Sequence, residues 1–404
     1  MTRIAPIWTS GFRPFFLAAA AYGPLLLMFW LGARLGWWAT PAAGLALPLL
    51  HAHEMLFGFA AALVCGVLLT AVPSWSGAAE LRGLPLASLA LLWLAGRASV
   101  LGAPFLEGRS WAPLLSGLID CALFPVLCVM LLATIRRARR RLFWWTLPPL
   151  AAFAAANIAF HLALADGSNS GAQHALLLGV HALAFLFTLY GGLFIPAFTR
   201  RWLHERGEHA AAILMPLEYA TAIAMVAFAC ADLLGASHGW MIAAAGAAAL
   251  VQAWRFARWR GWKTASEPLL WCIHLGYLWL IAALALRAAA ELIHNLPPDA
   301  WIHAFTVGAY GMLKIGLMTR VVLRHTGRPV RVGWLMSFAF AMVFAAASLR
   351  LAYSVHELGE SALVGSAVLW AAALLVYLAR FGPLLLRPSL HRQRSDRLAN
   401  PALA

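Results

Sequence analysis

The chain has 404 residues, of which 63% are hydrophobic and 11% are charged, and its formal net charge is +15 at pH 7. Soluble globular domains carry about 25% charged residues, so this composition excludes a soluble fold and indicates an integral membrane protein. The excess of basic residues follows the loop pattern described below and does not indicate binding to nucleic acid.

Apolar segments recur along the whole chain, and each is long enough to cross the hydrocarbon core of a membrane. We count about twelve of them. In chain order they are residues 14–36, 45–71, 84–103, 111–135, 142–165, 173–197, 213–235, 240–257, 268–290, 299–323, 333–353 and 361–382. They predict an all-α, polytopic membrane helix bundle that forms one integral membrane domain over residues 1–404, with a basic tail at residues 383–404.

The loops between these segments alternate in charge. One set is basic and includes residues 136–141, Arg200 with Arg201, and residues 255–263. The intervening loops, such as residues 166–173 and 296–300, carry almost no basic residue. Because basic loops stay in the cytoplasm, this pattern predicts that both termini are cytoplasmic.

The first polar feature inside an apolar segment is His51-Ala52-His53-Glu54. Each ionisable side chain in hydrocarbon costs roughly 2.5–3.5 kcal/mol, so such residues usually have a function. Two histidines separated by one helical residue point to nearly opposite faces, at about 100° per residue. The pair is therefore better suited to serve two different centres than to chelate one ion, and it indicates cofactor binding.

Most other histidines fall in the same outer layer of the predicted bundle. Those inside spans are His51, His53, His161, His174, His181 and His303. Pro48 and Pro298 precede the histidines of the second and tenth spans by similar distances, so these two helices could offer axial nitrogens to a planar macrocycle. Imidazole binds copper, iron and zinc, and the absence of thiolates in the layer favours haem or histidine-bound copper. No CxxCH motif occurs for covalent attachment, which favours b-type haem.

Three further charges lie within the spans. Arg97 and Asp120 are expected at similar depth, and the pattern leaves two interpretations open: an ion pair between their helices, or Arg97 as partner of haem propionates. Glu54 and Asp120 are the carboxylates best placed to relay protons. Lys314, deep in the tenth span, has no partner that the sequence identifies.

Six segments together resemble the NnrS family of bacterial inner-membrane proteins over nearly the whole chain. The segments are GFRPFF from Gly11, HAHEMLFGFAAALVCGVLLTAVPSWSG from His51, LWLAGR from Leu92, IPAFTRRWL from Ile195, PLLWCIHLGYLWL from Pro268 and HAFTVGAYGMLKIGLMTRVVLRHTGRP from His303. The resemblance implies a protein of the cytoplasmic membrane that contains haem and copper, acts in nitric oxide metabolism and relieves nitrosative stress. A more distant likeness of architecture links the predicted bundle to the catalytic subunit of haem-copper oxidases, from which function does not follow.

Three hypotheses follow. The first is a haem protein that binds or turns over nitric oxide. In this hypothesis the cofactor-binding residues are His51, His53, His303 and Arg97, and a nearby copper ion is bound by His161, His174 or His181. The second is a non-enzymatic carrier of haem or copper, or a nitric oxide buffer. The third is a twelve-helix secondary transporter, which is disfavoured because no convincing internal repeat is evident and the histidines lie outside the midplane. The sequence leaves open the electron donor and whether nitric oxide is turned over or only bound.

Overall fold

The computed structural model describes residues 4–38, 46–103, 109, 111–136, 141–209, 211–355 and 358–390, and these contain helices and no strand. Eleven of the described helices or helix pairs are long and apolar enough to cross a membrane. The predicted span 240–257 also forms a helix, α10 (His238–Arg258), which is less apolar because it carries Gln252, Arg255 and Arg258. Of the predicted tail at 383–404, residues 391–404 lie outside the described residues.

The chain divides into two compact units. The first contains residues 1–182, 321–330 and 377–404, and the second contains residues 183–320 and 331–376. Two long helices, α8 (Asn169–His204) and α15 (Glu360–Leu386), contribute residues to both.

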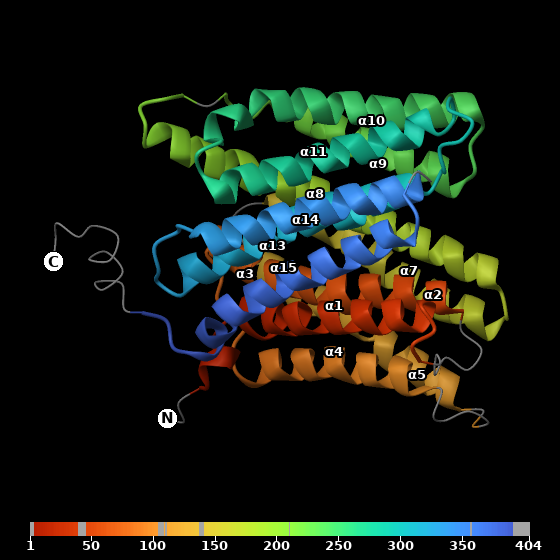
Figure 1. The fold of residues 1–404 in the computed structure, drawn as a ribbon. Coiled ribbons are helices and arrows are strands. Elements are labelled where there is room, and N and C mark those ends of the chain that lie inside the picture. The colour runs from red at the N-terminus through yellow and green to blue at the C-terminus, as the bar shows by residue number, and fades with distance from the viewer. Residues whose placement is uncertain are drawn as a thin grey trace. The chain divides into compact units, whose positions relative to one another are not determined.

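The first unit is built from α1 to α7 and the start of α8 (Figure 1). Its elements are α1 (Phe12–Arg34), α2 (Leu47–His53), a π-helix (Glu54–Ala60), α3 (Ala61–Ser76), α4 (Leu84–Gly102), α5 (Ala112–Cys121), α6 (Leu123–Arg136) and α7 (Leu147–Ala165). The helix made of α2, the π-helix and α3 is the most buried of the spans, since 94% of its apolar window is inside the protein. Helices α1, α4, α6 and α7 supply its neighbours within the unit.

The second unit is built around α11 (Pro268–Ala289). Helix α10 packs against both α9 (Met215–Leu233) and α11 (Figure 1), and α14 (Trp334–Ser354) packs on the segment that follows α11. That segment consists of α12 (Ala300–His303), a second π-helix (Ala304–Tyr310) and α13 (Gly311–His325), whose last turn belongs to the first unit.

The two interrupted helices have the same local organisation around their histidines. In each, a histidine (His53 or His303) is the last residue of a short α segment, and a π-helix of seven residues follows directly. The fifth π residue is glycine in both, Gly58 and Gly308. A π-helix has i→i+5 hydrogen bonds and no distinctive sequence pattern, so sequence periodicity could not reveal this correspondence.

Candidate metal centre in the first unit

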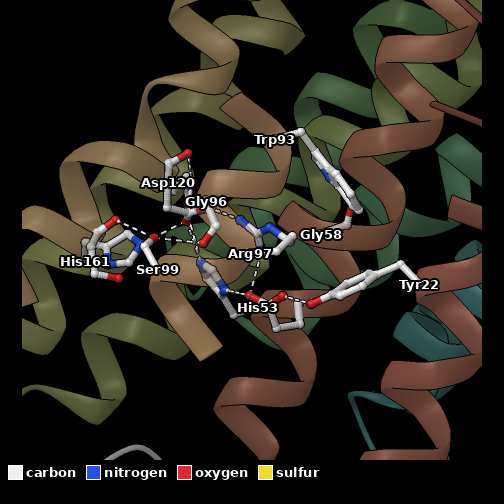
Figure 2. A network of polar contacts seen from close by, with 12 residues as sticks. Tyr22, His53, Gly58, Trp93, Gly96, Arg97, Ser99, Asp120 and His161 are labelled. Carbon is white, nitrogen blue, oxygen red and sulfur yellow. Dashed lines mark hydrogen bonds and ion pairs between the residues drawn. The ribbon is translucent and has the colours of Figure 1, made fainter. Parts of the chain in front are cut away.

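A buried network of polar side chains joins five neighbouring spans of the first unit (Figure 2). It contains Tyr22 of α1, His53 and Glu54 at the junction of α2 with the π-helix, Arg97 of α4, Asp120 of α5, and Asn157 and His161 of α7. The network lies among apolar residues, so its polar atoms need partners within the protein. Nε of Arg97 is the exception in the network, because it is buried without a hydrogen-bond partner among the described residues.

His53 is fully buried and both of its ring nitrogens are engaged. Nδ1 lies 2.9 Å from Oε1 of Glu54, and the carboxylate accepts the proton of that nitrogen. Nε2 lies 3.0 Å from Oδ1 of Asn157 and 3.2 Å from Oδ2 of Asp120. The ring is also stacked on Phe160, with centroids 4.4 Å apart. The orientation of this imidazole is therefore fixed from all sides.

Arg97 neutralises part of the negative charge of the network. Its Nη1 donates to Oε1 of Glu54 at 2.5 Å, and its Nη2 donates to Oδ1 of Asp120. The structure thus shows the ion pair that was one of the two interpretations of Arg97 and Asp120. When both histidines are neutral, the positive charge of Arg97 balances one of the two carboxylates, and the network has a net charge of −1. A buried negative charge of this kind favours the binding of a cation.

Oδ2 of Asp120 is the point on which the network converges. Asn157 donates to it through Nδ2 at 2.9 Å, and Nε2 of His161 lies 3.0 Å from it. Nε2 of His53 is the third neighbour at 3.2 Å. The ligand atoms of His53, Asp120 and His161 all lie within 4.8 Å of one another.

These three residues fit a metal ion. If Nδ1 of His53 donates to Glu54, the lone pair of Nε2 faces the oxygens of Asn157 and Asp120, which is unfavourable unless a cation or a second proton lies between them. Two ligands bound to one metal at about 2.1 Å and separated by 3.0–3.2 Å subtend about 90–100°, an angle common in metal sites. Two imidazoles and one carboxylate are a known ligand set for iron, and imidazole binds copper and zinc equally well.

The surrounding residues have the properties of an outer ligand shell. Metal-binding histidines usually donate their other ring nitrogen to a carboxylate, as His53 does to Glu54. Tyr22 in turn donates its hydroxyl to Oε2 of Glu54. Trp93 of α4 donates Nε1 to the carbonyl oxygen of Gly58 at 2.9 Å, and its ring meets Tyr22 edge-on at 5.5 Å.

Two glycines allow the helices to approach closely enough for this arrangement. A Cβ atom on Gly58 would lie 2.7 Å from Cε1 of Tyr22 and 3.1 Å from Oε2 of Glu54. A Cβ atom on Gly96 would lie 3.1 Å from Oδ1 of Asp120 and 3.3 Å from its Cα. Larger residues at either position would push α1 or α5 away from the network.

The other predicted site residues lie elsewhere. His51 faces α1, where its ring lies 4.4 Å from that of Trp30, so the two histidines of the pair do serve different surroundings. His174 is exposed on α8 and His181 is buried on the same helix. Within the described residues, neither they nor His51 and His303 belong to a group of three potential metal ligands.

His303 belongs to the second unit, where Nη2 of Arg350 on α14 lies 2.8 Å from its Nε2. Lys314 is buried in α13, and its ammonium group lies 4.9 Å from the centre of the Tyr310 ring. The sequence did not indicate Tyr22, Trp93 or Arg350 as site residues. Aromatic residues are common in membrane helices, and so is a single arginine near a helix end.

A family model described as NnrS protein matches residues 6–389, which is nearly the whole chain. A search of curated proteins finds no match.

Proposed function

This chain belongs to the NnrS protein family and is a nitric-oxide-related membrane protein, and from that premise we propose that His53, Asp120 and His161 bind a copper or iron ion at which nitric oxide is bound and metabolised. The observation that carries the proposal is the convergence of two imidazole nitrogens on one carboxylate oxygen in a buried network of net negative charge.

A copper or iron ion at this site would supply an open coordination position and a redox couple. Nitric oxide is small and apolar, so it can reach a buried site through the lipid without a polar channel. Reduction of two molecules of nitric oxide to nitrous oxide and water consumes two electrons and two protons, so the reaction requires an external electron donor and a proton path.

The residues of the network have separate tasks in this proposal. Glu54 holds His53 by Nδ1 and keeps Nε2 directed at the metal. Tyr22, bonded to the other oxygen of Glu54, connects the network to α1 and provides the next exchangeable proton. Arg97 forms ion pairs with Glu54 and Asp120, while Asn157 holds Oδ2 of Asp120 between the two histidines.

We propose haem, of b type, as the second cofactor, with His303 of the second unit as the first histidine to test and His51 of the first unit as the alternative. The sequence also suggested His53 and Arg97 for haem. His53 suits the metal ion better, because its Nε2 faces Asp120, and Arg97 is engaged in its ion pairs with Glu54 and Asp120. The likeness between the helices that carry His53 and His303 supports one centre on each helix, with the metal ion on the helix of His53 and haem on the helix of His303.

We further propose that the protein resides in the bacterial inner membrane, that both of its termini lie in the cytoplasm, and that it relieves nitrosative stress. The alternation of basic and neutral loops supports this orientation. Fusion of alkaline phosphatase to the loop at 166–169 and to the C-terminus tests it, since only the loop fusion should be active.

The decisive experiment measures metal content and nitric oxide consumption of the purified protein. We expect about one copper or non-haem iron per chain, lost in His161→Ala and retained in His174→Ala, because His174 is an exposed histidine outside the network. Consumption of nitric oxide with a reductant should follow metal content. Equal metal content in both variants would overturn the site, and a metal-loaded protein that only binds nitric oxide would support a buffer over an enzyme.

A further inference from the structure

Three arginines gather at one end of the first unit, outside the proposed metal centre. Arg328 follows the end of α13, Arg380 lies in the last part of α15, and Arg387 directly follows α15. We call these three residues the arginine cluster. Helix α1 begins beside them, since buried Arg13 of α1 bonds to the end of α15. The cluster therefore lies where several membrane spans end.

The backbone around the cluster is held rigidly. Arg13 donates through Nη1 to the carbonyl oxygens of Leu385 and Arg387, each at 2.7 Å, and through Nη2 to the hydroxyl of Ser389 at 2.9 Å. The following residue, Leu390, donates its backbone N–H to the carbonyl oxygen of Thr326 at 3.0 Å. The chain after α15 is thereby fastened to the turn after α13.

The hydroxyl of Ser389 adds a second link, because it donates to the carbonyl oxygen of His325 at 3.1 Å. Arg328 is anchored in the same turn, where its Nη1 donates to the carbonyl oxygen of Thr326 at 3.3 Å. Arg328 and Arg387 are consequently kept near each other although like charges repel.

The described residues offer the cluster no neutralising carboxylate. None of the three arginines forms an ion pair with a described acidic residue. Glu80 is within electrostatic range of Arg13, but it is already paired with Arg82 at 3.8 Å. Burial and the positive charges of Arg380 and Arg387 lower the pKa of Arg328. An anion would relieve this repulsion.

We propose that the arginine cluster is a binding site for the phosphate headgroup of an anionic phospholipid. Guanidinium groups bind phosphate oxygens in pairs, and basic pockets at the ends of membrane helices recognise anionic headgroups. The end of α15 also presents apolar surface for an acyl chain, since Leu386 is 52% exposed. Charge and location thus both match a lipid.

The test compares the full-length protein with Arg328→Gln/Arg380→Gln/Arg387→Gln in mild detergent. Phosphatidylglycerol or phosphatidylcholine is added, thermal unfolding is followed, and retained lipid is counted by native mass spectrometry. We expect saturable binding of phosphatidylglycerol with a rise in melting temperature, weakened by roughly fivefold for each arginine removed. Arg201→Gln/Arg206→Gln is the matched control, because these exposed arginines already have Glu205 and Trp202 as partners.

Equal phosphatidylglycerol binding by the triple variant and the control would overturn the proposal. Equal stabilisation of the wild-type protein by glycerol phosphate would show that a free oxyanion suffices, which overturns the lipid assignment. If the triple variant does not fold, Arg387→Gln is used instead, because Arg13 bonds to the backbone of Arg387 and that acceptor remains. Weaker binding of a single phosphatidylglycerol by Arg387→Gln than by the wild-type protein supports the site. Unchanged binding rejects it.

Discussion

His53 and His161 lie with their rings nearly perpendicular, 5.4 Å apart at 82°, and both direct Nε2 at the same oxygen of Asp120. An edge-to-face contact is itself favourable, but it does not require both Nε2 atoms to face one carboxylate oxygen. Their common target is what brings them together. The relationship is typical of two ligands of one metal ion, and its outer shell can be tested separately from its ligands.

Glu54 is the first residue to test in that shell. We expect Glu54→Gln to weaken metal binding about 10–100-fold, because the amide orients His53 less strongly than the carboxylate does. Competition with a chelator, read by metal analysis, measures the change. Glu80→Gln is the control, since Glu80 lies outside the network. Equal affinities of both variants would remove Glu54 from the shell.

Arg97 contributes to stability through its buried ion pairs. We expect Arg97→Gln to destabilise the protein by about 3–5 kcal/mol, because Glu54 and Asp120 would keep buried charge without a partner. Exposed Arg82, paired with Glu80 at 3.8 Å, should cost less than about 1 kcal/mol when changed to Gln. Unfolding in detergent compares the two, and similar losses would contradict the buried role of Arg97.

His303, or alternatively His51, is proposed to coordinate haem. Replacement of the coordinating histidine by Ala should remove or shift the Soret band of the purified protein, whereas His238→Ala, at an exposed histidine, should leave it unchanged. The Soret band is measured in optical spectra of the oxidised and the reduced protein. A full spectrum in both variants, with haem bound, would exclude these ligands.

Arg260 is the only described residue other than glycine with a positive φ, 56°. Because a left-handed conformation is unfavourable for a side chain, Arg260→Gly should stabilise the protein, by about 0.5–1 kcal/mol. The loss of its bond to the carbonyl oxygen of His209 opposes this gain only weakly, since that bond is exposed. The melting temperatures of the wild type and the variant measure the net effect. A lower melting temperature for the variant would show that the hydrogen bond to His209 outweighs the relief of backbone strain.

Glu291 follows α11, outside the spans, and gives a pH-dependent contribution. A hydrogen bond from Arg287 lowers the pKa of this carboxyl below its ordinary value of 4.5, with a smaller contribution from His238. A lowered pKa in the folded state stabilises the protein above pH 4.5, and this stabilisation is lost as the pH falls through the folded value. The stability difference between the wild type and Glu291→Gln should therefore shrink from pH 7 to acid.

The sequence predicted the spans and part of the site for physical reasons that can be stated. Long apolar segments are strongly constrained by the membrane, so their positions were evident, and the positions of His53, Asp120 and His161 in neighbouring spans made them candidates. Their meeting at one oxygen depends on helix packing, which periodicity does not encode. Tyr22 and Trp93 were not predicted, because an isolated aromatic residue in an apolar helix has no signature of a polar contact.

The π-helices have a further consequence for how the histidines are aimed. A π-helical turn is equivalent to an α-helical turn with one inserted residue, so it rotates everything before it by about 100° relative to everything after it. Deleting a single residue within Glu54–Ala60 would let the helix return to an α register and turn His53 away from Asp120 without changing any ligand. The number of residues in this segment, and not only their identity, determines which neighbour His53 faces.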